Sequence, residues 1–155
     1  MFILKVIQKF EDYNIPYAVV GGHAVALHGA VRGTVDIDFI TAIQSENLVI
    51  IEKALSELGL TPVLPLHAKE LYDNKDLYMK ERNLVAWGFV NQANPLEHVD
   101  IIITEEINNE NVETIRVKNM DIKILSKNAL IAMKKRSGRE QDLVDIEALE
   151  RIDGV

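Results

Sequence analysis

The sequence contains no cysteine, which excludes disulfide bonds, thiolate zinc sites and cysteine nucleophiles. It also lacks an apolar run long enough to span a bilayer. Polar residues such as Lys5 and Gln8 interrupt the N-terminal segment, so this segment does not resemble a secretory leader. Because a chain without cysteine suits a reducing compartment, these absences predict a cytoplasmic protein with no membrane partner.

Positive charge is scarce as well. Lysine and arginine number 17 against 24 aspartates and glutamates, which gives a formal net charge of −7. A surface of this sign repels polyanions and argues against a long nucleic-acid track. One basic run stands out near the C-terminus, and it consists of Lys127, Lys134, Lys135, Arg136 and Arg139. It is either a solvated helix face or a local anion site.

The 155 residues suit one domain covering 1–155, since we find no repeat, low-complexity segment or linker. Apolar periodicity predicts helices at 3–13, 23–27, 45–58 and 68–80, with Ser45 as an N-cap, and two more helices from Ser126 onward. Strands are predicted at 17–20, 35–41, 61–64, 84–90, 98–104, 113–117 and 120–125, with turns at 91–95 and at Lys118-Asn119. This pattern indicates an α/β (α+β) protein with a mixed β-sheet flanked by helices.

Two aspartates in the strand at 35–41 are the most informative residues. Side chains alternate along a strand, so Asp36 and Asp38 share one face while Ile37 and Phe39 bury on the other. Two adjacent carboxylates repel unless a cation neutralises them, and oxygen ligands favour Mg²⁺ or Mn²⁺. Taken alone, the pair is equally compatible with a solvated strand end or a structural Ca²⁺ site.

A third carboxylate, Asp100, interrupts the apolar strand at 98–104, where an unpaired buried charge is costly. On a strand beside Asp36 and Asp38 it becomes a third ligand and a candidate base. A position at the rim of the sheet is the alternative. His98 shares a strand face with Asp100, and we interpret it as a structural histidine or as a polar neighbour of that carboxylate.

The glycine pair Gly21-Gly22 lies between a predicted strand and a predicted helix. Exposed backbone N–H groups at such a junction allow a phosphate to approach closely, although a plain tight turn explains the glycines equally well. The sequence contains neither a dinucleotide-binding nor a Walker-type glycine motif. Trp87 lies within a predicted strand and is expected in the core.

In combination, these segments resemble the DNA-polymerase-beta-like nucleotidyltransferase superfamily. Its signature is a hydrophobic residue, Gly, Gly or Ser, nine to thirteen residues, and then Asp-hydrophobic-Asp-hydrophobic. Here Val20-Gly21-Gly22 is followed by thirteen residues and then by Asp36-Ile37-Asp38-Phe39. The third superfamily aspartate maps to Asp100, with Asp121 as a weaker competitor. The resemblance covers most of the chain and implies the nucleotidyltransferase fold.

The resemblance also implies an activity and a site. The expected reaction moves a nucleoside monophosphate from a nucleoside triphosphate, such as ATP, to an acceptor hydroxyl. It implies Asp36, Asp38 and Asp100 as catalytic metal ligands, with Asp100 accepting the hydroxyl proton. The remaining implied residues contact or neutralise the triphosphate, and they are Gly21, Gly22, Arg32, Lys135 and Arg139.

The C-terminal segment 134–146 is similar to the closing motif of toxin-type nucleotidyltransferases from abortive-infection and toxin–antitoxin systems, which implies an antitoxin partner. Short lincosamide-type and aminoglycoside-type antibiotic nucleotidyltransferases look alike too. A non-catalytic nucleotide-binding or interaction module is the third alternative. The acceptor stays open among tRNA, a protein hydroxyl and a small molecule.

Overall fold

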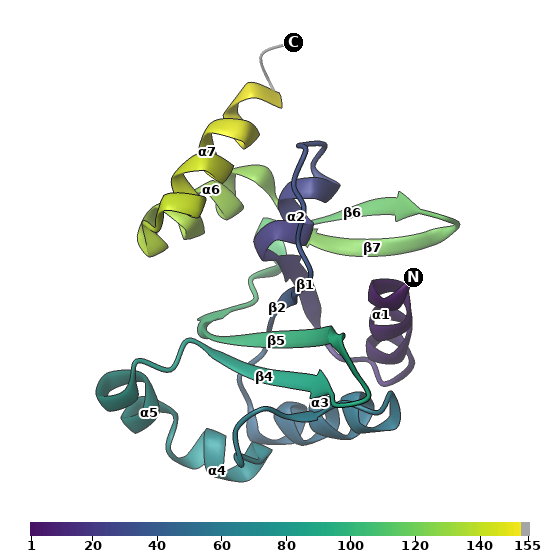
Figure 1. Ribbon diagram of the computed structural model, residues 1–155, viewed down its shortest axis with the longest axis vertical. Coiled ribbons are helices and arrows are strands. Elements are labelled where there is room, and N and C mark those ends of the chain that lie inside the picture. Colours follow the sequence, from purple (N-terminus) through teal and green to yellow (C-terminus); the bar gives the residue numbers. More distant parts are fainter. Residues whose placement is uncertain (153–155) are drawn as a thin grey trace.

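The structure is a computed structural model that describes residues 1–152 (Figure 1). Its helices are α1 (Phe2–Asp12), α2 (Gly21–Leu27), α3 (Ser45–Glu57), α4 (Ala68–Asp73), α5 (Lys75–Arg82), the short 3₁₀ helix η1 (Asn109–Asn111), α6 (Lys127–Ser137) and α7 (Glu140–Ile152). Its strands are β1 (Tyr17–Val20), β2 (Ile37–Thr41), β3 (Thr61–Pro62), β4 (Ala86–Asn91), β5 (Asn94–Glu106), β6 (Val112–Val117) and β7 (Met120–Leu125).

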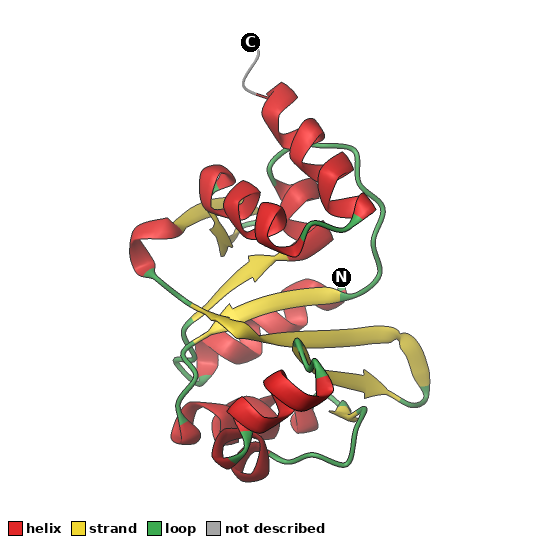
Figure 2. Ribbon diagram, turned by 90° about the vertical axis from the view of Figure 1, so that its left-hand side faces the viewer, coloured by secondary structure: helices red, strands yellow, loops and turns green. Residues whose placement is uncertain are grey.

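All seven strands form one sheet in the order β3-β4-β5-β2-β1-β7-β6. The central strands β5 and β2 run parallel, as do β1 and β7, whereas β1 and β2 are antiparallel. Antiparallel hairpins, β4–β5 and β6–β7, extend the sheet on its two sides. Figure 2 shows the strands lying between two groups of helices. The predicted α/β class with a mixed sheet is confirmed.

Core residues pack on both faces of the sheet, and the aromatic ones lie on the face opposite the aspartates. Phe39 of β2 packs against Phe10 of α1, with ring centroids 5.0 Å apart, and against Tyr17 of β1 at 5.9 Å. Helix α3 contacts α1 beside this aromatic cluster and buries its apolar stripe. Trp87 is buried as expected, and its Nε1 donates a hydrogen bond to the Leu66 carbonyl.

Several predicted boundaries are wrong, each for a local reason. The helix expected at 68–80 is broken into α4 and α5 at Asn74, whose side-chain amide donates to the Glu70 carbonyl and ends the first helix. Ser45 is the first helical residue, and Gln44 occupies the N-cap. Strand β2 begins at Ile37, so Asp36 precedes it. The turn expected at 91–95 is shorter, because Asn94 already pairs with Asn91.

Other local predictions are confirmed. Ser126 caps α6, its Oγ accepting a hydrogen bond from the Ala129 amide. Lys118 and Asn119 both adopt positive φ in the turn between β6 and β7, as a two-residue hairpin requires. Within residues 1–152, no helix has the length and apolar character that a bilayer crossing demands.

Candidate active site

The parallel pairing of β2 with β5 brings two carboxylates side by side. Asp38 is the register partner of Asp100. Since neighbouring side chains in register point to the same face, both carboxylates lie on the face away from Phe39. Asp121, the alternative third aspartate, lies on β7 and forms an exposed ion pair with Arg116 at 2.9 Å. The structure therefore brings Asp100, and not Asp121, to Asp38.

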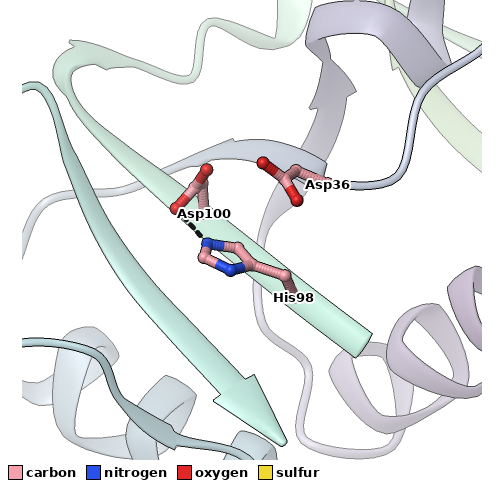
Figure 3. A group of neighbouring side chains, drawn as sticks. All are labelled: Asp36, His98 and Asp100. Carbon is pink, nitrogen blue, oxygen red and sulfur yellow. Dashed lines mark hydrogen bonds and ion pairs between the residues drawn. The ribbon is translucent and has the colours of Figure 1, made fainter. Parts of the chain in front are cut away.

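Asp36 approaches the same place from the segment before β2. One side-chain oxygen or nitrogen atom each of Asp36, His98 and Asp100 lies within 4.8 Å of the others. Figure 3 shows these side chains converging, with a hydrogen bond of 3.0 Å between His98 Nε2 and Asp100 Oδ1. Asp36 is exposed, whereas His98 and Asp100 are partly buried. The three aspartates of the sequence analysis thus gather where the start of β2 lies beside the middle of β5.

The glycine pair lies against this cluster. Gly21 has φ +66, a conformation that side chains disfavour, and a Cβ built on it would lie 2.0 Å from Asp38 Oδ2. A Cβ on Gly22 would lie 2.9 Å from both Cβ and Oγ1 of Thr34. The close approach of Asp38 to the backbone therefore requires glycine at position 21, whether or not a phosphate binds there.

The carboxylate cluster is electrostatically strained in the absence of a cation. Burial raises the pKa of Asp38 to about 7, and the charges of Asp100 and Asp36 act in the same direction. The ammonium of Lys134 opposes this rise. A site that holds several carboxylates together at such an electrostatic cost is well suited to bind a positive ion.

A cavity of about 630 Å³ opens from Asp38 and Asp100 toward the C-terminal helices. The cations Lys134, Arg136 and Arg139 line it as well, together with their ion-pair partners Glu105 and Asp142. Its apolar wall includes Ile102, Leu130 and Met133. A pocket of this size, with apolar walls and a few convergent charges, suits a nucleotide-sized ligand. One cavity therefore brings together the carboxylates of the sheet and the ion pairs of the C-terminal helices.

The cations are held by carboxylates of α7 and β5. Lys134 is almost fully buried, and its Nζ lies 2.8 Å from Asp145 and 3.5 Å from Asp142. Arg139 pairs with Asp142 at 2.9 Å. Arg136 pairs with Glu105 of β5 at 2.9 Å, at the lining of the cavity. These contacts fix α7 against α6 and hold the positive charge in place.

The structure places the remaining predicted residues differently. Arg32 does not line the cavity, and its Nε donates to Asp145 at 2.9 Å. Lys135 is exposed and also lies outside the cavity lining, whereas its neighbour Lys134 is inside. The sequence marks Lys134 only as one member of the basic run, although Lys134 follows the apolar Leu130 by one helical turn and therefore shares its buried face.

No family model matches the chain, and no curated protein matches it. Solved structures do match. The lincosamide antibiotic adenylyltransferase LnuA, bound to lincomycin, is 18% identical with a TM-score of 0.63, over 97% of this chain and 96% of that one. The antibiotic-resistance factor ANT(2'')-Ia is 14% identical with a TM-score of 0.66, over 96% and 80%. A nucleotidyltransferase-like protein from Paracoccidioides brasiliensis is 16% identical with a TM-score of 0.55, over 96% and 72%. The chain therefore has the nucleotidyltransferase fold.

Proposed function

We propose that this protein, which has the nucleotidyltransferase fold, is a metal-dependent enzyme that moves a nucleoside monophosphate from a nucleoside triphosphate to an acceptor hydroxyl. The observation that carries the proposal is the pairing of Asp38 with Asp100 at a cavity that Lys134 and Arg139 also line. A triphosphate needs both kinds of group, because its charge is balanced partly by metal ions and partly by side chains.

The donor set fits a hard divalent cation. Asp36, Asp38 and Asp100 offer carboxylate oxygens, and the burial of Asp38 together with the charges of the other two raises its pKa, a cost that a bound cation would reduce. Mg²⁺ or Mn²⁺ bound there would neutralise charge on the reacting phosphate and on the departing pyrophosphate. We assign the three aspartates as the ligands of this ion.

Residues of the protein have the remaining catalytic and binding roles. Asp100 accepts the proton of the attacking hydroxyl, since it combines a place at the cavity with a place in the carboxylate cluster. Lys134 and Arg139 balance the triphosphate charge, and Lys134 takes the role expected of Lys135. Gly21 and Gly22 allow the phosphates to approach the backbone, while Arg32 supports Asp145.

Calorimetric titration with a non-hydrolysable triphosphate and Mg²⁺ tests the site. We expect the variant Asp36→Asn/Asp38→Asn to bind at least about tenfold more weakly than the wild type, a loss of about 1.4 kcal/mol. Asp121→Asn is the matched control, because it removes an aspartate from an exposed ion pair on β7. Equal affinities for the wild type and the double variant would refute the metal site.

The acceptor can be identified by transfer of label. Each nucleoside triphosphate, labelled at the α-phosphate, is incubated with the protein, Mg²⁺ and a cell lysate, and the labelled product is sized. A tRNA-sized or protein product supports a toxin-type role with an antitoxin partner, as the C-terminal motif suggests. In a parallel reaction with a lincosamide or an aminoglycoside in place of the lysate, a labelled antibiotic supports the second candidate, which is favoured by the near full-length match to LnuA. Binding without transfer would instead indicate a non-catalytic module.

A further inference from the structure

His98 and Asp100 lie two residues apart on β5, so their side chains share one face of the sheet. Nε2 of His98 lies 3.0 Å from Oδ1 of Asp100, and one ligand atom of each of these residues and of Asp36 lies within 4.8 Å of the other two. Two ligands at right angles on an ion with bonds of about 2.1 Å are about 3.0 Å apart. The distance between His98 and Asp100 matches that of two adjacent ligands of one ion, and Asp36 lies near enough to join them.

The opposite strand keeps this space open. Gly88 of β4 is the register partner of Asp100. A Cβ on Gly88 would lie 2.9 Å from Asp100 Oδ1 and 3.4 Å from His98 Nε2. A side chain at this position would therefore push against the Asp100 carboxylate and come into contact with the His98 imidazole. The strand pair is built so that both side chains fit in contact with each other beside Asp36.

The 3.0 Å contact between His98 Nε2 and Asp100 Oδ1 has two chemical interpretations, depending on which ring nitrogen carries the proton. In the first, the imidazole only orients the carboxylate, as outer partners of metal ligands do. In the second, Nε2 offers its lone pair to the cation, and the ring proton resides on Nδ1. The second interpretation requires that this nitrogen lie near the other ligands of the cation. His98 meets the requirement, because it lies close to both Asp36 and Asp100.

We infer that His98 is a direct ligand of the cation held by Asp36 and Asp100, and that this site therefore selects Mn²⁺ or a similar transition metal over Mg²⁺. The selection follows from donor chemistry, because imidazole nitrogen binds transition metals while Mg²⁺ prefers oxygen. The inference rests on the proposed function and adds to it a fourth ligand and a metal preference.

Electron spin echo spectroscopy of bound Mn²⁺ detects a directly coordinated nitrogen. The wild-type protein, labelled with ¹⁵N-histidine and loaded with Mn²⁺, is expected to show strong coupling to one ¹⁵N nucleus. His98→Asn should bind Mn²⁺ without this coupling. His67→Asn is the matched control and should keep it, because His67 pairs with Glu52 at the surface. Circular dichroism and metal-free melting temperatures establish that the variants are folded.

Metal-binding affinities are a second measurement, and they distinguish a direct ligand from a histidine that only orients Asp100. His98→Asn should weaken Mn²⁺ binding by about tenfold or more and change Mg²⁺ binding much less. Equal losses for both ions, or Mn²⁺ bound to the wild type without nitrogen coupling, would overturn the role of His98 and leave the proposed function intact. Failure of the wild-type protein to bind either ion would overturn the proposed function, and the inference with it.

Discussion

At the scale of single residues, Gly21 shows how closely the backbone approaches the carboxylate cluster. Gly21 and Gly138 have nearly the same backbone conformation, with φ +66 and +65. They differ in their surroundings, since a Cβ on Gly21 would meet Asp38 Oδ2 at 2.0 Å and one on Gly138 would meet nothing nearer than 3.7 Å. A comparison of the two positions therefore separates the cost of the left-handed backbone from the cost of a clash with Asp38.

We predict that Gly21→Ala destabilises the protein by about 2 kcal/mol more than Gly138→Ala, because both pay for the left-handed backbone but only the first displaces Asp38. Urea denaturation measures the difference. Gly21→Ala should also lose Mg²⁺ binding, which Gly138→Ala should retain. Similar stability losses in both variants would show that the loop around Gly21 relaxes without moving Asp38.

At the scale of elements, α6 and α7 are held together by a buried charge cluster. Lys134 of α6 reaches Asp142 and Asp145 of α7, and all three side chains are almost fully buried. Removing one member of a buried ion pair leaves the partner's charge uncompensated. The helix pair is therefore sensitive to the loss of a single ammonium group.

We predict that Lys134→Met lowers the free energy of unfolding by about 3 kcal/mol, because it leaves two buried carboxylates short of a cation. Lys135→Met is the control, since Lys135 is adjacent and exposed. Urea denaturation gives the stabilities, and calorimetry gives triphosphate affinity, which should fall only in Lys134→Met. If Lys135→Met lowered affinity as much, the anion site would be misassigned.

The sequence predicts the helices and strands better than it predicts where they begin and end. Apolar periodicity identifies α1 and α3, and Ser126 marks the start of α6, because these signals are local. The break at Asn74 is missed, since the helical pattern continues through it and one side-chain hydrogen bond decides the outcome. Lys134 is missed because the positions of its carboxylate partners depend on how α7 folds back on α6.

At the scale of the whole molecule, the strand order determines the site, and strand order is not encoded locally. The spacing from Gly21 to Asp36 indicates a nucleotidyltransferase-type site, but only the register of β2 with β5 shows that Asp100 lies beside Asp38. The proximity of His98 to Asp36 likewise depends on this long-range pairing. Pairings between segments distant in the chain cannot be derived from periodicity.

The buried carboxylates Asp142 and Asp145 should make the stability of the protein depend on pH. Burial alone raises the pKa of Asp145, but hydrogen bonds from Lys134, Gln141 and Arg32 outweigh it and hold the pKa below its usual range. For Asp142, burial is similarly outweighed by Arg139 and Ser137, and the pKa is lowered further. The unfolded chain then binds protons more readily than the native state does.

The stability contributed by these carboxylates is therefore present above the unfolded-state pKa of about 3.9 and is lost as the pH falls toward the native values. We predict that Asp145→Asn is less stable than the wild type at pH 7 and that the difference shrinks below pH 4. Denaturation in urea at pH 7, 5 and 3 measures it. A difference that stayed constant over this range would mean that Asp145 contributes packing and not charge.

The parallel register of β2 and β5 also has a consequence for folding kinetics. The helices α3, α4 and α5 separate these strands in the chain, so the repulsion between Asp38 and Asp100 is absent from the unfolded ensemble and arises only when the strands pair. A divalent cation bound at the proposed site would relieve a cost that exists only in the paired state. We predict that Mg²⁺ slows unfolding in stopped-flow experiments, and that any acceleration of folding reports how far β2 and β5 have already paired in the transition state.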